Sequence, residues 1–157
     1  MYTNILVPFD GSEGSLHALE AAVNLATGSE PVDITVLQVT GISDFDNSTF
    51  ETAVRMAGLE PVDETQIEAL RQSYAIAHND QMKQRVAEYF ESLPDNINRR
   101  IVVKRGTARD IICQYAKDND IDCIIMGRRG VSGIRAALGS VSTAVLRGTD
   151  LPVLVVK

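Results

Sequence analysis

Apolar and polar residues alternate in two different rhythms along this chain. Short runs of consecutive apolar and β-branched residues are typical of buried strands, whereas apolar residues spaced three and four apart are typical of amphipathic helices. Strands are predicted over residues 3–9, 32–40, 97–104, 121–126 and 151–156. Helices are predicted between them, over residues 12–27, 62–93, 107–119 and 140–147.

The order of these elements predicts the fold class. Uninterrupted apolar strands separated by helices form parallel sheets that are covered on both faces, and their crossovers are right-handed. We therefore expect an α/β protein with a single open, doubly wound sheet of five mainly parallel strands. No linker, low-complexity tract or internal repeat divides the sequence, so residues 1–157 are expected to form one domain.

Two local features add to this outline. Thr107 and Asp110 match a capping box, in which Thr107 accepts a bond from a backbone N–H and Asp110 reaches back to the helix start. Residues 41–61 interrupt the rhythm and are expected to form a long loop. Because this loop follows the second strand, both a lid over a ligand and a disordered connection are open as its role.

Composition argues against several classes of function. The net charge of −6 argues against a general nucleic-acid binder, because such proteins carry a basic excess. The N-terminal residues do not resemble a signal peptide, and no stretch has the length of a membrane span. We therefore expect a cytoplasmic protein without nucleic-acid or membrane partners. Cys113 and Cys123 are too few for a structural zinc site and are interpreted as small hydrophobic side chains.

Charge is spread unevenly along the chain. Residues 123–149 include no acidic residue, yet they contain the arginines Arg128, Arg129, Arg135 and Arg147. A glycine-rich, arginine-bearing stretch within an acidic protein indicates a local anion site. Chance, combined with a solvated basic face, explains the same observation equally well.

The predicted strand ends place this stretch where open parallel sheets bind their ligands. Gly127 and Gly130 follow the fourth strand, and Gly139 precedes the fourth helix. Glycines let backbone N–H groups approach an anion, and the first turn of a helix favours negative charge. Alternatively, the glycines form a tight turn and Ser140 caps the helix. Further donors in the segment are Arg128, Arg129, Ser140 and Ser142.

A second candidate position lies at the end of the first strand. Asp10 can bond a ribose hydroxyl or a metal-bound water; alternatively, Asp10 and Ser12 form an Asx-type turn and helix cap. Established nucleotide motifs are missing, because the chain has no Gly-Lys pair for a P-loop and no GxGxxG after the first strand.

The segments VPFDGS, IIMGRRG, GSVS and LPVLVV, in this order, resemble the universal stress protein family over essentially the whole chain. Its nucleotide-binding members carry a Gly-x-x-Gly followed by a Gly-Ser or Gly-Thr pair. Gly127, Gly130, Gly139 and Ser140 fit that pattern, although the spacer of eight residues between Gly130 and Gly139 is one residue short.

The resemblance implies strand order 3-2-1-4-5 and a bound adenine nucleotide, either ATP or AMP or ADP, and it leaves open whether Mg or Mn accompanies it. Asp10 would contact the ribose, and Val39 would contact the adenine through its backbone. The implied nucleotide-binding residues are Pro8, Phe9, Asp10, Val39, Met126, Gly127, Arg129, Gly130, Gly139, Ser140, Val141 and Ser142. It also implies a homodimer that pairs through the strand Leu151–Val156.

Three functions are compatible with these residues. The first is an ATP-binding regulatory protein of the stress response. The second is a weak ATP hydrolase, for which no catalytic residue can be assigned, and the third is a family member that acts through its dimer surface without nucleotide. Under the first function, Gly127→Val or Gly139→Val is expected to abolish binding and leave the fold intact, because a β-branched side chain would fill the phosphate position.

Overall fold

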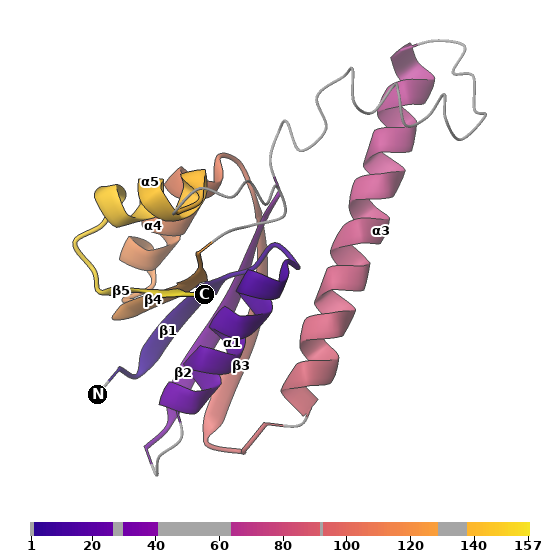
Figure 1. The fold of residues 1–157 in the computed structure, drawn as a ribbon. Coiled ribbons are helices and arrows are strands. Elements are labelled where there is room, and N and C mark those ends of the chain that lie inside the picture. The colour runs from indigo at the N-terminus through magenta and orange to yellow at the C-terminus, as the bar shows by residue number, and fades with distance from the viewer. Residues whose placement is uncertain (1, 27–29, 41–63, 92, 129–137) are drawn as a thin grey trace. The chain divides into compact units, whose positions relative to one another are not determined.

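The computed structural model describes residues 2–26, 30–40, 64–91, 93–128 and 138–157, and within them strands and helices alternate (Figure 1). The strands are β1 (Asn4–Pro8), β2 (Val32–Thr40), β3 (Ile97–Arg105), β4 (Cys123–Gly127) and β5 (Val153–Val156). The helices are α1 (Glu13–Leu25), α3 (Glu64–Glu91), α4 (Ala108–Asp118) and α5 (Ser140–Gly148). All the predicted strands and helices are therefore confirmed, with small shifts at their ends. The predicted loop over residues 41–61 lies outside the described residues.

The strands form one five-stranded sheet in the order β3-β2-β1-β4-β5, and every neighbouring pair is parallel. This confirms the expected α/β class and the implied strand order. The order reverses between β1 and β4, because the chain moves from β1 toward one edge of the sheet and from β4 toward the other. Such a reversal leaves a crevice at the carboxyl ends of the two central strands.

The chain divides into two compact units. One consists of Met1–Gly41 together with Phe90–Lys157 and contains the whole sheet with α1, α4 and α5. The other, Ile42–Tyr89, contains most of α3. All of the residues predicted to bind nucleotide belong to the first unit.

Helices cover the two faces of the sheet within this first unit (Figure 1). Successive side chains of a strand point to opposite faces, so each central strand contributes to both layers of the core. On the face that carries α4 and α5, the buried cluster consists of Leu6, Leu37, Ile112, Tyr115, Ala116, Ile121, Ile124, Met126 and Val145. By alternation, Ile5, Val7 and Ile125 face α1, and all three are fully buried. Each such side chain contributes about 2 kcal/mol of hydrophobic stabilisation.

The starts of α1 and α4 differ in how they are capped. Ser12 caps α1, because its hydroxyl oxygen accepts a hydrogen bond from the Ser15 N–H at 3.2 Å. At α4 the predicted capping box is wrong, since the Thr107 side chain makes no capping hydrogen bond. Asp110 instead accepts a bond from the neighbouring Arg109 guanidinium at 2.8 Å. Aspartate is one methylene shorter than the glutamate usual at this position, which limits its reach to the helix start.

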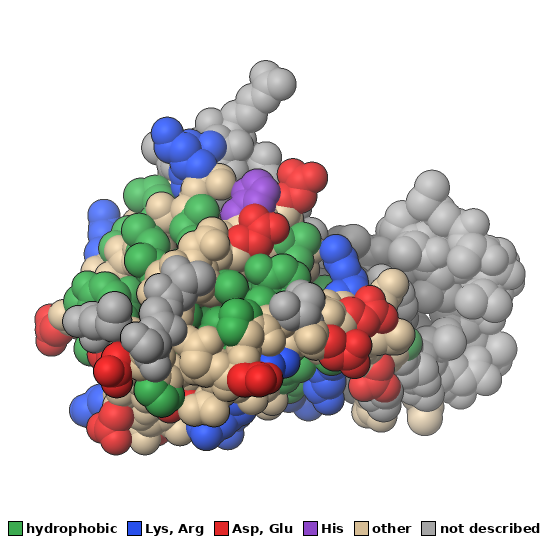
Figure 2. All heavy atoms as spheres, turned by 90° about the horizontal axis from the view of Figure 1, so that it is seen from below, with side chains coloured by type: hydrophobic (Ala, Val, Ile, Leu, Met, Phe, Trp, Pro, Cys, Tyr) green, Lys and Arg blue, Asp and Glu red, His purple; other side chains and the backbone are tan. Residues whose placement is uncertain are grey.

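The surface mixes charged and apolar side chains. Figure 2 shows acidic and basic side chains scattered over one face of the molecule, with hydrophobic side chains between them. Large hydrophobic side chains that are more than a third exposed include Leu25, Leu138, Val141, Leu146 and Leu154. Among the described helices, none is both long enough and apolar enough to cross a membrane.

Candidate functional site

The candidate site lies at the carboxyl ends of β1 and β4, where the strand order reverses. Leu6 of β1 pairs with Ile124 of β4, and this register carries Pro8 alongside Met126. Phe9 is 4% exposed, so its ring belongs to the core. Asp10 follows and is exposed at the edge of the sheet. The structure thus brings together the two segments that the sequence marked separately.

Asp10 belongs to a tight turn that leads into α1. Its Oδ1 accepts a hydrogen bond from the Ser12 N–H at 3.0 Å and another from the Ser12 hydroxyl at 2.6 Å. Gly11 between them has a φ of 79°, a conformation that glycine adopts without steric cost. The Asx-turn interpretation of Asp10 and Ser12 is therefore confirmed. The two bonds from Ser12 orient the Asp10 carboxylate at the carboxyl end of β1.

Gly127 ends β4 against the first turn of α1. A Cβ on Gly127 would lie 2.6 Å from the carbonyl carbon of Gly14 and 2.7 Å from its oxygen. This corrects the expectation that a side chain at Gly127 would leave the fold intact, because the space it would enter holds backbone. Sequence reasoning also missed Gly14. The feature that could have pointed to Gly14 is its position in the first turn of a helix, where glycine lowers helix propensity and so indicates another requirement.

Gly139 and Ser142 connect the start of α5 to the end of β4. The Gly139 N–H donates to the carbonyl of Arg128 at 2.8 Å. The Ser142 hydroxyl donates to the same carbonyl at 3.1 Å and to the Gly139 carbonyl at 3.0 Å. The Arg128 N–H in turn donates to the carbonyl of Val156 at 2.7 Å. Because Ser142 is 2% exposed, its hydroxyl anchors the start of α5 from the inside.

The first turn of α5 has the features of an anion site. Gly139 is the N-cap residue and provides no side-chain hydrogen bond to the turn, and no acidic residue lies in it. The first N–H groups of a helix have no partner within the helix, and the macrodipole gives them a partial positive charge. Ser140 and Val141 are exposed in this turn. Arg128 is half-buried beside it, whereas Arg129 and Gly130 lie outside the described residues.

Val39 lies near the end of β2, on the other side of β1. The carbonyl of Leu37 accepts a bond from the Phe9 N–H at 2.9 Å, so Leu37 directs its peptide groups toward β1. By strand alternation, Val39 directs its N–H and C=O to the same side. Pro8 is the last residue of β1 that pairs with β2. The backbone of Val39 therefore faces the space beyond the end of β1.

The two cysteines lie away from this site. Cys123 is buried in β4, and Cys113 is half-buried in α4; both are free thiols. Burial raises the pKa of both thiols above the ordinary value, and the nearby Arg109 guanidinium only partly offsets this for Cys113. A raised pKa keeps a thiol protonated at neutral pH, so both cysteines are poor nucleophiles. This agrees with their interpretation as hydrophobic side chains.

Comparison with known proteins agrees with this fold. The family model described as "Universal stress protein family" matches residues 1–157. The chain is 29% identical to the Bacillus subtilis universal stress protein YxiE over 100% of both chains. It is 30% identical to the Methanocaldococcus jannaschii universal stress protein MJ0531, covering 100% of this chain and 83% of that protein. The solved structure of UspA from Lactobacillus plantarum superposes with a TM-score of 0.73 at 28% identity, covering 99% of this chain and 98% of that one. This chain belongs to the universal stress protein family.

Proposed function

We propose that this protein binds an adenine nucleotide, ATP or its relatives AMP and ADP, at the crevice between β1 and β4. It would act in the cytoplasm as a nucleotide-responsive binding module of the stress response. The observation that carries the proposal is the first turn of α5, which presents backbone N–H groups and no acidic side chain at the strand-order reversal.

Each part of a nucleotide has a chemically matched group along this edge. The N–H and C=O of Val39 suit the hydrogen-bonding edge of adenine. The Asp10 carboxylate, oriented by Ser12, suits a ribose hydroxyl. The backbone N–H groups of the first turn of α5, from Ser140 to Ser142, suit the phosphates, with Arg128 beside them; the Ser142 hydroxyl is bonded within the protein. We include Arg129 and Gly130 in the proposed phosphate site on the strength of the sequence pattern.

Proteins of the same fold support this assignment. A universal stress protein from Arabidopsis thaliana has been solved with AMP bound, and its TM-score to this chain is 0.51 at 14% identity. A universal stress protein in complex with cAMP has a TM-score of 0.53 at 24% identity. Both ligands contain adenine, ribose and phosphate, which are the three parts that the crevice suits.

Binding is favoured over dedicated catalysis by the chemistry of the crevice. Asp10 is a carboxylate placed there within the described part of the chain, and its Oδ1 already accepts two hydrogen bonds from Ser12. Among the described residues, no group of three His, Cys, Asp or Glu side chains could hold a metal ion. In this proposal a Mg or Mn ion is included only as a companion of the ATP phosphates. Slow hydrolysis of bound ATP is the alternative activity.

The substitution Ser140→Asp tests the phosphate position. An aspartate in the first turn stabilises a helix, so the fold is expected to persist, but its charge would repel the phosphates. Calorimetric titration with ATP and with AMP is expected to show binding to the wild type and affinity weakened about tenfold in the variant.

Thr107→Asp is the matched control, because it places the same charge at the start of α4, where Thr107 makes no capping bond. It should leave nucleotide affinity unchanged. Absence of ATP and AMP binding by the wild type at millimolar nucleotide would rule out the proposed function. Equal affinity in wild type and Ser140→Asp would rule out α5 as the phosphate site.

We also propose a homodimer that forms through Leu151–Val156. β5 is an edge strand with β4 as its neighbour, and Leu154 is 42% exposed on it. An exposed apolar edge strand can pair with the edge strand of another chain.

Leu154→Glu is expected to convert a dimer into a protomer of 17.1 kDa, as measured by light scattering after gel filtration. Leu25→Glu, at a leucine 46% exposed on α1, should leave the dimer intact. A monomeric wild type would contradict the proposal.

A further inference from the structure

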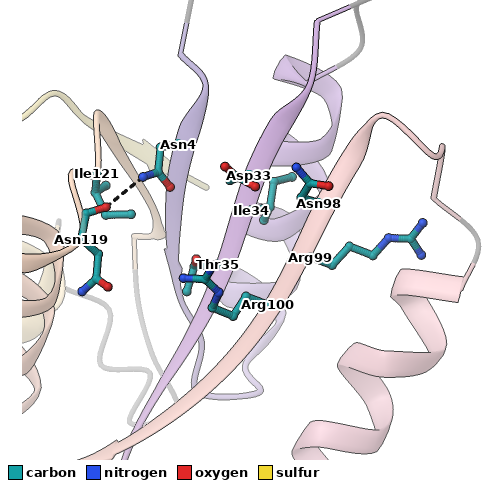
Figure 3. Close-up of a pocket in the computed structure, with 9 residues that line it drawn as sticks. All are labelled: Asn4, Asp33, Ile34, Thr35, Asn98, Arg99, Arg100, Asn119 and Ile121. Carbon is teal, nitrogen blue, oxygen red and sulfur yellow. Dashed lines mark hydrogen bonds between the residues drawn. The ribbon is translucent and has the colours of Figure 1, made fainter.

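A polar hollow lies at the opposite, amino-terminal edge of the sheet from the proposed nucleotide site. Strand register places Asn4 of β1, Asp33 of β2 and Asn98 of β3 side by side in one row (Figure 3). Asp33 and Leu37 are four residues apart on β2, so their side chains point to the same face of the sheet. Leu37 packs on the face that carries α4, and this row therefore lies on that face as well. The hollow has a volume of about 230 Å³, which is smaller than a drug-sized ligand pocket and restricts it to a ligand of a few non-hydrogen atoms.

Thr35 forms the floor of this hollow. It is 3% exposed, and register places it between Leu6 of β1 and Arg100 of β3. Within the described part of the chain, the structure gives its hydroxyl no hydrogen-bond partner. Figure 3 shows this side chain lining the hollow next to Arg100. A hydroxyl held at the base of a hollow without a protein partner is available to a polar ligand.

Opposite charges lie on either side of this floor. Asp33 precedes Thr35 on the same face of β2, and Arg100 is its neighbour on β3. Both charged side chains are exposed, and no ion pair joins either of them to another described residue. The guanidinium of Arg99 donates instead to the carbonyls of Phe90 and Leu93, so it is occupied elsewhere. The hollow therefore contains one unpaired negative and one unpaired positive group.

The wall nearest β1 is held in place by hydrogen bonds. The Asn4 amide Nδ2 donates to the carbonyls of Asn119 at 2.9 Å and Asp120 at 3.0 Å. The Asn119 Nδ2 donates in turn to the carbonyl of Tyr115 at 2.9 Å. These bonds leave the Asn4 Oδ1 as an acceptor, and Figure 3 shows this oxygen on the side of β2. The acceptors, Asn4 Oδ1 and the Asp33 carboxylate, thus lie on β1 and β2, whereas the cationic donor Arg100 lies on β3.

We propose that this hollow binds a small zwitterion whose ammonium and carboxylate groups are close neighbours, such as a free α-amino acid. Asp33 and the Asn4 Oδ1 accept hydrogen bonds from the ammonium group. Arg100 and the Thr35 hydroxyl donate to the carboxylate, with the Asn98 amide beside them. A ligand carrying both charges can bond both of these groups, whereas a ligand with a single charge can bond only one of them.

The test is titration of ¹⁵N-labelled protein with L-alanine, followed by backbone amide shifts. Saturable shifts are expected at Asp33, Thr35 and Arg100, with a dissociation constant in the millimolar range, since the hollow is small and open. Thr35→Val removes the hydroxyl and keeps the shape, and it should weaken binding about fivefold. Arg100→Gln should weaken it about tenfold.

Lys104→Gln is the matched control, because Lys104 is an exposed cation farther along the same face of β3. It should leave the titration unchanged. Acetate, ethylamine and glycerol, which carry one charge or none, should shift these amides much less than alanine at equal concentration. Equal shifts with any of the three would overturn the proposal. So would a lack of saturation with alanine, or equal weakening by Arg100→Gln and Lys104→Gln.

Discussion

Gly127→Val is expected to destabilise the fold by about 3 kcal/mol, because a β-branched side chain cannot be accommodated at the end of β4. Even the first carbon of that side chain would lie 2.6 Å from the Gly14 carbonyl carbon, in the first turn of α1. The obstruction is backbone, so no rotamer change relieves it. β4 and α1 would have to separate, and both contribute to the buried core around Ile125. Urea unfolding followed by circular dichroism measures the loss.

Gly148→Ala provides the control for adding a side chain at a crowded glycine. Its Cβ would lie 2.8 Å from Nε of Arg109, which is the far end of a flexible side chain that can move away, and 3.1 Å from the Cys113 sulfur, which must shift by a few tenths of an ångström. The expected loss is below about 1 kcal/mol. If Gly127→Val were as stable as the wild type, Gly127 could not lie as close to the Gly14 backbone as described. Loss of nucleotide binding in Gly127→Val would reflect damage to the fold, which makes Ser140→Asp the cleaner probe of the site.

Asp122→Ala is expected to cost about 2 kcal/mol, because this carboxylate joins the start of β1 to the start of β4. Its Oδ2 accepts bonds from the Thr3 N–H at 2.8 Å, the Thr3 hydroxyl at 3.2 Å and the Asn4 N–H at 3.1 Å. Three charge-assisted hydrogen bonds, if their contributions were simply added, would stabilise the fold by more than this 2 kcal/mol. However, Oδ1 of the same carboxylate is buried without a partner among the described residues, and this desolvation offsets part of the gain.

The control for Asp122 is another carboxylate that makes a surface bond. Asp118 accepts from the Gln114 amide at 2.7 Å on the exposed side of α4, and Asp118→Ala should cost only a few tenths of a kcal/mol. Hydrogen exchange adds a local readout, since the amides of Thr3 and Asn4 should lose protection in Asp122→Ala. Equal stability of the two variants would show that the bonds at Asp122 contribute nothing net.

Local sequence pattern was sufficient for the elements and for their class of sheet. The apolar run around Ile124 favours a strand that is covered on both faces, and the helices on either side of it along the chain indicate a parallel sheet. The Asp10-Gly11-Ser12 turn was likewise readable, since its hydrogen bonds join residues two and three positions apart. At Thr107 the same reasoning was wrong, because the Thr107 side chain makes no capping bond and Asp110 bonds the neighbouring Arg109 instead.

Residue spacing predicted the candidate site only in part. Spacing identified Gly127, Gly139 and Ser140 as members of one segment, and strand-end logic placed that segment beside Asp10. Spacing could not reveal that Ser142 points inward and anchors α5 to the Arg128 carbonyl. It also gave no sign that Thr35, in the middle of an apolar strand, forms the floor of a polar hollow.

Residue pattern alone was enough to assign the strands and helices, and to place glycines, serines and an aspartate after the first and fourth strands. Those properties follow from periodicity and from contacts within a few residues. Three contacts could be read only from the folded chain: the Gly14 backbone leaves no room for a side chain at Gly127, Asp122 bonds the start of β1, and Asp33 and Arg100 line one hollow. Each of these depends on segments far apart along the chain, whose approach is set by sheet register and helix packing.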